Sequence, residues 1–203
     1  MDPLNNVLTI KARFLGTVSE TGSIWNPGWK EEFNYNNVGI LFLEVMQFLK
    51  KSPLFNAPNT RDQAFWRIPI GDTETNALGM TQRATDKSRR ECKAMMDILF
   101  KKQSPGKMPT VVSYLSSIKD KHNAKPFISD CGHVGLCPHV SLRKDEIFVP
   151  VGSHVPIIFR RVTGGQSDWR SVYLWGGIGE RFPRTPANMM PSLRRKYLAS
   201  KIQ

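Results

Sequence analysis

The chain has 203 residues, 40% of them hydrophobic, and its 29 Lys and Arg against 17 Asp and Glu residues give a formal net charge of +12 at pH 7. This length and apolar content exclude a disordered tail and predict one globular domain over residues 1–203. No secretory signal or apolar run long enough to cross a bilayer is found, so we expect a cytoplasmic protein without a transmembrane segment.

The amino-terminal part predicts a strand followed by a helix. Residues 8–14 alternate apolar and polar side chains, and residues 17–25 either extend this strand or return from it as a second one. Apolar residues at helical spacing then predict an amphipathic helix over residues 38–51. Pro53 ends this pattern, because proline cannot continue a helix.

Three more helices are expected in the middle of the chain. The first covers residues 60–67 with Thr60 as its cap, and residues 68–80 after it are expected to be irregular. A third short helix covers residues 109–121, with proline in its first turn. Between them, a helix with a cationic outer side is predicted by an apolar stripe made of Cys92, Met95, Met96, Leu99 and Phe100.

Beyond residue 125 the pattern changes from helical to extended. Short strands divided by Gly, Pro and Asp turns are predicted over residues 127–129, 135–136, 146–151, 155–162 and 170–175. Apolar residues occupy consecutive positions in these strands, which predicts a sheet covered on both faces or curled into a partial barrel. A short basic helix is expected to end near Ser200. The sequence therefore predicts an α+β single domain, with a small, mostly antiparallel curled sheet or partial barrel and three to five helices.

Three collinear motifs carry a resemblance to a known family. The first motif, FWRIPIGDTETN at residues 65–76, has a Trp-Arg pair followed by a Gly-Asp turn and then by an Asn. Two further motifs follow along the chain in the same order as in the family described below. They are FISDCGHVGLCPHVSLRKDEIFVPVGSHVPIIFRRV at residues 127–162 and YLWGGIGE at residues 173–180. Over about residues 8–180 the chain resembles the C-terminal region of fungal heterokaryon-incompatibility proteins, which leaves residues 181–203 as a basic extension. The N-terminal half of such proteins, which is associated with triggering cell death, has no counterpart here.

The resemblance, without a recognisable catalytic constellation, favours a non-catalytic interaction or regulatory domain that binds a protein partner or a small organic ligand. A second hypothesis is a small cofactor-independent enzyme, an isomerase, cyclase or hydrolase of fungal secondary metabolism. In that case the residues to test first are Arg67, Asp72, Asn76, Arg160, Tyr173 and Glu180. No nucleotide-binding glycine motif is found, so no cofactor is expected.

The candidate catalytic residues also have a structural interpretation. Trp66 would pack in the core, while Asp72 would cap a turn and pair with an arginine. Arg160 and Glu180 would form either a buried ion pair that serves the fold or the polar floor of a cleft.

Cys131, His133, Cys137 and His139 place four good zinc-ligand types within nine residues. Known structural zinc sites instead join two distant pairs of ligands, so we predict a turn and no metal, with this cluster as the weaker alternative. A Cys–His nucleophilic pair would also need a third orienting group, which the sequence does not indicate. The three cysteines are too few and uneven for a disulfide framework, so reduced thiols are expected.

The positive charge suggests a third function, electrostatic binding of nucleic acid or of a membrane. No known nucleic-acid-binding motif accompanies the charge, so a solvated cationic face is the alternative. The residues concerned are Lys87, Arg89, Arg90 and Lys93 on a predicted helix and Arg194, Arg195 and Lys196 near the C-terminus.

Overall fold

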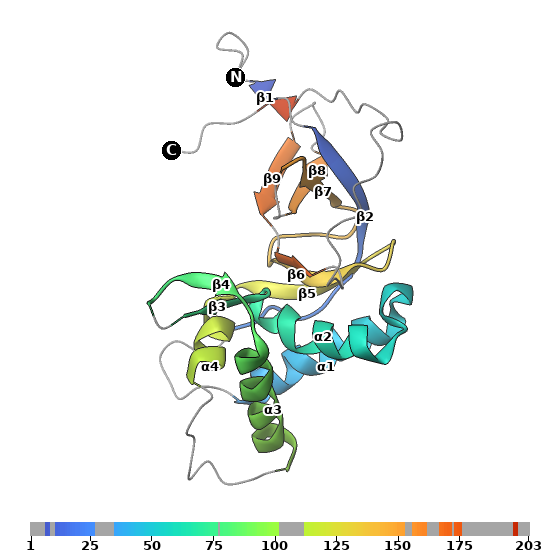
Figure 1. The fold of residues 1–203 in the computed structure, drawn as a ribbon. Helices are drawn as coiled ribbons and strands as arrows, with labels where there is room; N and C mark the ends of the chain where they lie inside the picture. Colours follow the sequence, from blue (N-terminus) through green and yellow to red (C-terminus); the bar gives the residue numbers. More distant parts are fainter. Residues whose placement is uncertain are drawn as a thin grey trace.

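The computed structural model describes residues 7–8, 11–26, 35–76, 78–101, 112–152, 156–161, 167–171, 173–175 and 197–198. Over these ranges the chain has the predicted α+β fold, with a curled antiparallel sheet on one side and a group of helices on the other (Figure 1). No helix within these ranges is long and apolar enough to span a membrane.

The helices lie below the sheet in the view of Figure 1. They are α1 (Tyr35–Lys51), α2 (Pro58–Arg67), α3 (Asp86–Lys101) and α4 (Val112–Lys119), with two 3-10 turns, η1 (Pro53–Phe55) and η2 (Ile68–Ile70). The four helices predicted before residue 125 are therefore present, but the cap of α2 is Ala57 rather than Thr60. The reason is Pro58, whose fixed φ and missing N–H suit the first position of a helix.

The main sheet has seven strands in the order β10-β6-β5-β2-β7-β8-β9, and each neighbouring pair is antiparallel. The two end strands, β9 and β10, are separated in the chain by residue 172 alone. The sheet therefore returns on itself as a partial barrel. Its strands are β2 (Ala12–Thr21), β5 (Ala124–Ser129), β6 (Val134–Pro138), β7 (Glu146–Pro150), β8 (Ile157–Arg161), β9 (Ser167–Ser171) and β10 (Tyr173–Trp175).

Strand β2 forms a corner of the barrel. Its first part, residues 12–17, pairs with β7, and its last part, residues 18–21, pairs with β5. The register shifts between Phe14 and Gly16 and again between Val18 and Glu20, which is how a strand bends from one sheet into another. Gly16 has a φ of +120°, and a Cβ there would clash with the Asp130 carboxylate. Glycine is thus required where the β5–β6 turn packs on the corner.

Both faces of β5 are buried, as the consecutive apolar residues predicted. Ala124 and Ile128 pack with the helices, whereas Phe127 faces the barrel interior. The apolar residues buried with Phe127 are Leu15, Val18, Cys137, Ile147, Val149 and Ile158. One strand therefore joins two hydrophobic clusters, which fixes the barrel on the helical layer.

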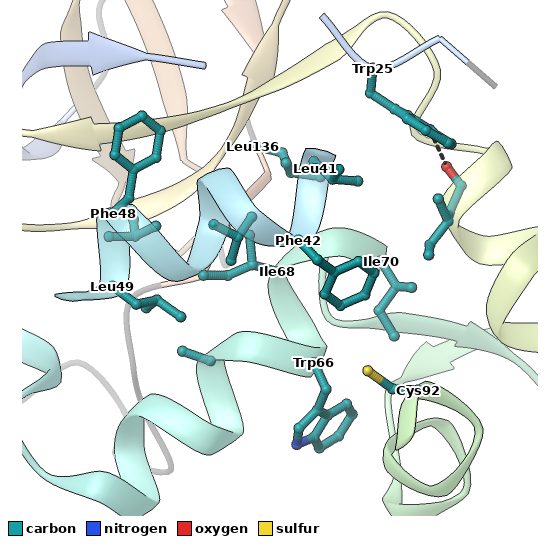
Figure 2. Packing of buried hydrophobic residues seen from close by; sticks show 14 of the residues in the cluster. Trp25, Leu41, Phe42, Phe48, Leu49, Trp66, Ile68, Ile70, Cys92 and Leu136 are labelled. Atoms are coloured by element: carbon teal, nitrogen blue, oxygen red, sulfur yellow. Dashed lines mark hydrogen bonds between the residues drawn. The ribbon is translucent and has the colours of Figure 1, made fainter. Parts of the chain in front are cut away.

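The helical cluster packs around α1 and α2 (Figure 2). Trp66 is buried, and its backbone carbonyl accepts a hydrogen bond of 2.6 Å from the Tyr114 hydroxyl of α4. Figure 2 shows a second such tie, in which the Trp25 indole N–H donates to the Ile118 carbonyl at 2.9 Å. These hydrogen bonds satisfy large buried polar groups and fix α4 against the core.

Three further predictions about local structure are wrong. The segment expected to be irregular, residues 68–80, contains the strand β3 (Thr73–Thr75), which pairs with β4 (Thr81–Arg83) directly after that segment. Both strands are too short to show an alternating pattern. Phe100 is 57% exposed, because it lies in the last turn of α3, where the burial of the helix declines. Residues Tyr197–Leu198 form a strand, β11, paired with β1 (Val7–Leu8) at the other end of the chain, a distant contact that local helical spacing cannot reveal.

Candidate functional site

The first motif, residues 65–76, builds the base of the β3–β4 hairpin. Asp72 follows Gly71 in the left-handed region, with a φ of 55°. Its carboxylate accepts hydrogen bonds from the Arg67 guanidinium and, at 2.7 Å, from Arg83 Nε on β4. The same Arg67 nitrogen donates to the Ala84 carbonyl at 2.8 Å. The structural interpretation of this segment is confirmed, because Asp72 holds a turn and pairs with arginines.

A second carboxylate, that of Glu74, ties the hairpin to the start of α3. Glu74 is buried and accepts hydrogen bonds from Gln82 Nε2 at 2.9 Å, from the Thr85 backbone N–H at 3.1 Å and from the Ser88 hydroxyl. Burial alone would raise the pKa of Glu74, but the hydrogen bonds from Ser88, Thr85 and Gln82 outweigh it and lower the pKa to about 2. Glu74 is therefore a fixed anion that helps to begin α3.

Asn76 closes the tip of the hairpin. Its side-chain oxygen accepts hydrogen bonds from the backbone N–H groups of Leu78 at 2.9 Å and Met80 at 3.0 Å. The Asn76 N–H donates to the Met80 carbonyl at 2.9 Å, and Gly79 has a φ of +75° between them. The turn thus presents two large apolar side chains to solvent, Leu78 at 79% and Met80 at 55% exposure.

Arg67, Asp72 and Asn76 all serve the same hairpin. The Arg67 guanidinium also lies over the Trp66 ring, 4.1 Å from its centroid. A catalytic acid, base or anion-binding group needs a proton, lone pair or N–H directed at a substrate. In this hairpin those groups are directed at protein atoms, so the arrangement is suited to rigidity rather than to proton transfer.

Arg160 forms a second polar centre at one end of the barrel. Its guanidinium donates to both oxygens of Asp145, at 2.9 and 2.8 Å, and to the Val140 carbonyl at 2.7 Å. Asp145 is buried and also accepts from the Leu142 N–H at 2.8 Å. A bidentate pair of this kind fixes the β6–β7 loop to β8.

The other two candidates of the possible enzyme site cannot be placed as side chains. Tyr173 lies opposite Leu136 in the β10–β6 register, and its side chain is outside the described part of the chain. Glu180 also lies outside the described residues, so the predicted pair of Arg160 and Glu180 stays a prediction.

The four Cys and His residues of the second motif are dispersed. Cys131 and His139 are exposed, His133 is half-buried, and Cys137 is buried among the residues of the barrel interior. In the described ranges, no group of three His, Cys, Asp or Glu side chains is arranged to hold a metal ion.

Neither thiol of this motif is an activated nucleophile. Burial raises the pKa of the Cys137 thiol to about 12. Burial and the charge of Asp130 also raise the pKa of Cys131, so both groups are protonated near neutral pH. Burial and the charge of Arg13 lower the pKa of His133, which favours the neutral ring. His154, which the sequence also offers as a histidine for a Cys–His pair, lies outside the described residues.

The turn between β5 and β6 instead docks the barrel on the end of α1. The Ser52 hydroxyl donates to the Gly132 carbonyl, and a Cβ on Gly132 would lie 2.8 Å from Pro53 Cδ. Asp130 accepts hydrogen bonds from the Thr17 N–H at 2.8 Å and hydroxyl at 2.9 Å. The motif around Cys131 is therefore used for close packing between chain segments.

The cationic face of α3 is present at the surface. Lys87, Arg90 and Lys93 are exposed, while Arg89 pairs with Asp62 of α2 at 2.7 Å. Residues 194–196, the other part of the predicted basic surface, lie outside the described residues.

Glu74 and Lys125 are among the charged residues that the sequence analysis missed. Both are buried. Lys125 had a usable signal, because strand alternation puts it on the same face as Phe127 and Ser129. The sequence gives no such signal for Glu74, because its partners Thr85 and Ser88 lie 11 and 14 residues later in the chain, at the start of α3.

Comparison with known proteins adds no family. No protein-family model matches the sequence, and neither the curated proteins nor the solved structures give a match. The resemblance to heterokaryon-incompatibility proteins therefore depends on the three motifs alone.

Proposed function

We propose that this chain is a non-catalytic protein-interaction domain, related to the C-terminal region of fungal heterokaryon-incompatibility proteins, and that the β3–β4 hairpin tip docks its partner. The observation that carries the proposal is the exposure of Leu78 and Met80 on a turn held by Asn76. The base of the same hairpin is fixed by Asp72 and Glu74.

A rigid turn is a favourable carrier for exposed apolar side chains. Binding through a mobile loop loses free energy, because the loop must be ordered when the partner arrives. Here the hydrogen bonds of Asn76, Asp72 and Glu74 already fix the backbone. Leu78 and Met80 can therefore enter an apolar pocket of a partner with little further ordering.

The charges near the hairpin indicate the chemistry of the partner. Arg83 lies on β4, and Lys87 and Arg90 are exposed in the first turns of α3 that follow. The whole chain carries a formal charge of +12. A protein with an apolar pocket rimmed by carboxylates is complementary to this surface.

The two other hypotheses have less support. The candidate catalytic residues with described side chains, Arg67, Asp72, Asn76 and Arg160, all bind protein atoms that hold turns or loops. Electrostatic binding of nucleic acid or membrane rests on charge alone, and it does not use the exposed apolar tip.

A photo-reactive amino acid in place of Leu78 tests the proposal, with the same substitution at Leu142 as the matched control. Leu142 is 55% exposed on the β6–β7 loop. We expect position 78 to cross-link a discrete protein in extracts of the source organism, and position 142 not to do so. Equal adducts from both positions, or adducts that nuclease treatment removes, would refute docking at the hairpin.

The cross-linked protein is then purified and its affinity measured with unmodified and substituted chains. Replacing both Leu78 and Met80 with Ser should weaken binding at least about tenfold, because buried apolar anchors dominate such interfaces. Leu142→Ser should leave the affinity unchanged. An unchanged affinity for the double variant would contradict the proposal.

A further inference from the structure

Strand β4 is the outer strand of the β3–β4 hairpin. Within the described ranges, its neighbour in this small sheet is β3 alone. All three residues of β4 are exposed. Helix α4 contacts β3 and lies below the hairpin in the view of Figure 1. The β4 side of the hairpin therefore faces solvent.

The hydrogen bonds of the hairpin show which way the backbone of β4 points. Antiparallel strands alternate between hydrogen-bonded and non-hydrogen-bonded residue pairs. The Asn76 N–H donates to the Met80 carbonyl at 2.9 Å, so this pair is hydrogen-bonded. The next pair along the ladder, Thr75 and Thr81, is therefore non-hydrogen-bonded. It follows that the N–H and C=O groups of Thr81 point away from β3, and the backbone of Arg83 has the same orientation.

The two faces of β4 differ in their chemistry. Successive side chains of a strand alternate, so Thr81 and Arg83 lie on one face, and Met80 and Gln82 lie on the other. The Arg83 side chain is 62% exposed, and Met80 is 55% exposed. Residues 81–93 contain five Lys or Arg and two acidic residues. A strand beside β4 is complementary to these faces if its acidic side chains lie next to Arg83 and its apolar side chains next to Met80.

We propose that β4 binds an extended segment of the partner protein in which acidic and apolar residues alternate, as an antiparallel third strand of the hairpin. In strand addition, backbone hydrogen bonds supply affinity and alternate side chains supply specificity. Opposite residues of antiparallel strands share a face, so the acidic residues lie opposite Thr81 and Arg83 and direct their N–H groups at β4. The inference rests on the proposed function, because the segment belongs to the partner that docks on Leu78 and Met80.

A second copy of this chain is the main rival occupant. Two β4 strands can pair about a twofold axis, as in a symmetric dimer. Such pairing would bring Arg83 and the cations near it together from two chains that each carry a charge of +12. The charge therefore favours the acidic segment. Sedimentation would identify the rival as a dimer that Thr81→Pro abolishes, and this result would contradict the proposal.

The probe is a capped peptide of the sequence Glu-Val-Glu-Val-Glu-Val, titrated into the isotope-labelled full chain. We expect saturable shifts of the Thr81 and Arg83 amide resonances and several-fold slower hydrogen exchange of the Thr81 N–H. The Thr75 amide, which points to the opposite edge, should not respond. A peptide with Lys in place of Glu should not bind. Binding of the Lys peptide, or no response of Thr81 to the Glu peptide, would overturn the proposal.

N-methylated peptides test the backbone pairing directly. Methylation of the glutamate nitrogens should abolish binding, because those N–H groups face β4 in the proposed arrangement. Methylation of the valine nitrogens should leave binding unchanged, because those groups point away from β4. Equal affinities of the two methylated peptides would rule out the proposed pairing.

Substitutions locate the bound strand on the protein. Proline lacks the N–H but is tolerated on an edge strand where that group faces solvent. Thr81→Pro should weaken peptide binding about tenfold, because a hydrogen bond to the added strand is lost. Thr75→Pro, the matched control on β3, should leave the affinity unchanged. If Thr81→Pro does not fold, the methylated peptides and the unmodified chain decide the question. An unchanged affinity in folded Thr81→Pro would contradict the site.

This inference and the proposed function fail in different ways. The peptide has no apolar pocket, so its binding does not depend on docking of the hairpin tip. A partner cross-linked at position 78, without a peptide response, would refute strand addition and leave the docking site. A peptide response without a partner cross-linked at position 78 would support the β4 site and refute docking at the tip.

Discussion

The Glu91 side chain accepts a hydrogen bond of 2.8 Å from the backbone N–H of Tyr114, so a buried carboxylate of α3 caps the first turn of α4. The Ser113 hydroxyl donates to the same carboxylate at 2.7 Å. A negative charge is favourable at this position, because the first N–H groups of a helix have no partner within it. Glu74 lies at the start of α3, where it accepts hydrogen bonds from the N–H of Thr85, the residue before the helix, and from the Ser88 hydroxyl in its first turn. A carboxylate from an earlier part of the chain is therefore bound at the start of each of these two helices.

Glu91→Gln should lower the free energy of unfolding by about 1–3 kcal/mol, because hydrogen bonds to a buried charge are replaced by weaker ones. Urea unfolding measures the change. Glu20→Gln is the control, since Glu20 forms an exposed ion pair with Lys51 whose loss should cost less than about 1 kcal/mol. Equal changes for the two variants would mean that Glu91 does not stabilise α4.

Gly16→Ala should destabilise the protein by about 2 kcal/mol or more, because the new Cβ meets the Asp130 carboxylate at a φ of +120°. Gly39→Ala is the matched control. Gly39 lies within α1, and a Cβ added there would have no neighbouring atom within 4 Å, so alanine should stabilise by about 0.5–1 kcal/mol. Thermal unfolding of both variants should therefore shift in opposite directions, and a shift in the same direction would refute the role of Gly16 at the corner.

The free energy of unfolding at acidic pH should depend on Glu74. Its pKa in the folded protein is lowered from 4.5 to about 2, so its contribution is complete above pH 4.5 and is lost as the pH falls towards 2. The contribution is about 3 kcal/mol, from about 1.4 kcal/mol for each pKa unit. Glu74→Gln should flatten the stability curve between pH 4.5 and 2, as measured by urea unfolding at each pH. Asp62→Asn, which changes a carboxylate that is 51% exposed, should leave this part of the curve unchanged.

A double-mutant cycle on Arg160 and Asp145 should show strong coupling. Arg160→Met leaves a buried carboxylate without its bidentate partner, and such a change costs about 3–5 kcal/mol. Combining it with Asp145→Asn should cost less than the sum of the single changes, by about 1–3 kcal/mol. Additive effects would mean that the pair does not act as a unit.

The elements with strong local patterns were predictable from the sequence. The apolar stripe of α1 and the apolar run of β7 gave these two elements nearly their observed places, whereas β5 was predicted only over residues 127–129. The partial barrel followed from consecutive apolar residues such as those at 147–149. The hairpin β3–β4 was not predictable in the same way, because two three-residue strands contain no period. Its stability comes from Asp72 and Glu74, which bind groups that lie ahead in the chain.

The polar partners were harder to predict than the elements. Arg160 was identified as a member of a buried pair, but its described carboxylate partner, Asp145, lies in a loop fifteen residues earlier. The sequence predicted a pair with Glu180 instead, which the described residues do not test. Ion pairs of this kind depend on register and loop path, and neither of these can be read from residue types.

The link between β9 and β10 also bears on self-association. A strand at the end of a sheet normally offers unpaired N–H and C=O groups to other chains. Here one stretch of chain, residues 167–175, covers β8 with its first part and β6 with its second. A chain ending before residue 167 would uncover two strand edges at once, and it would be prone to form intermolecular β-structure through both.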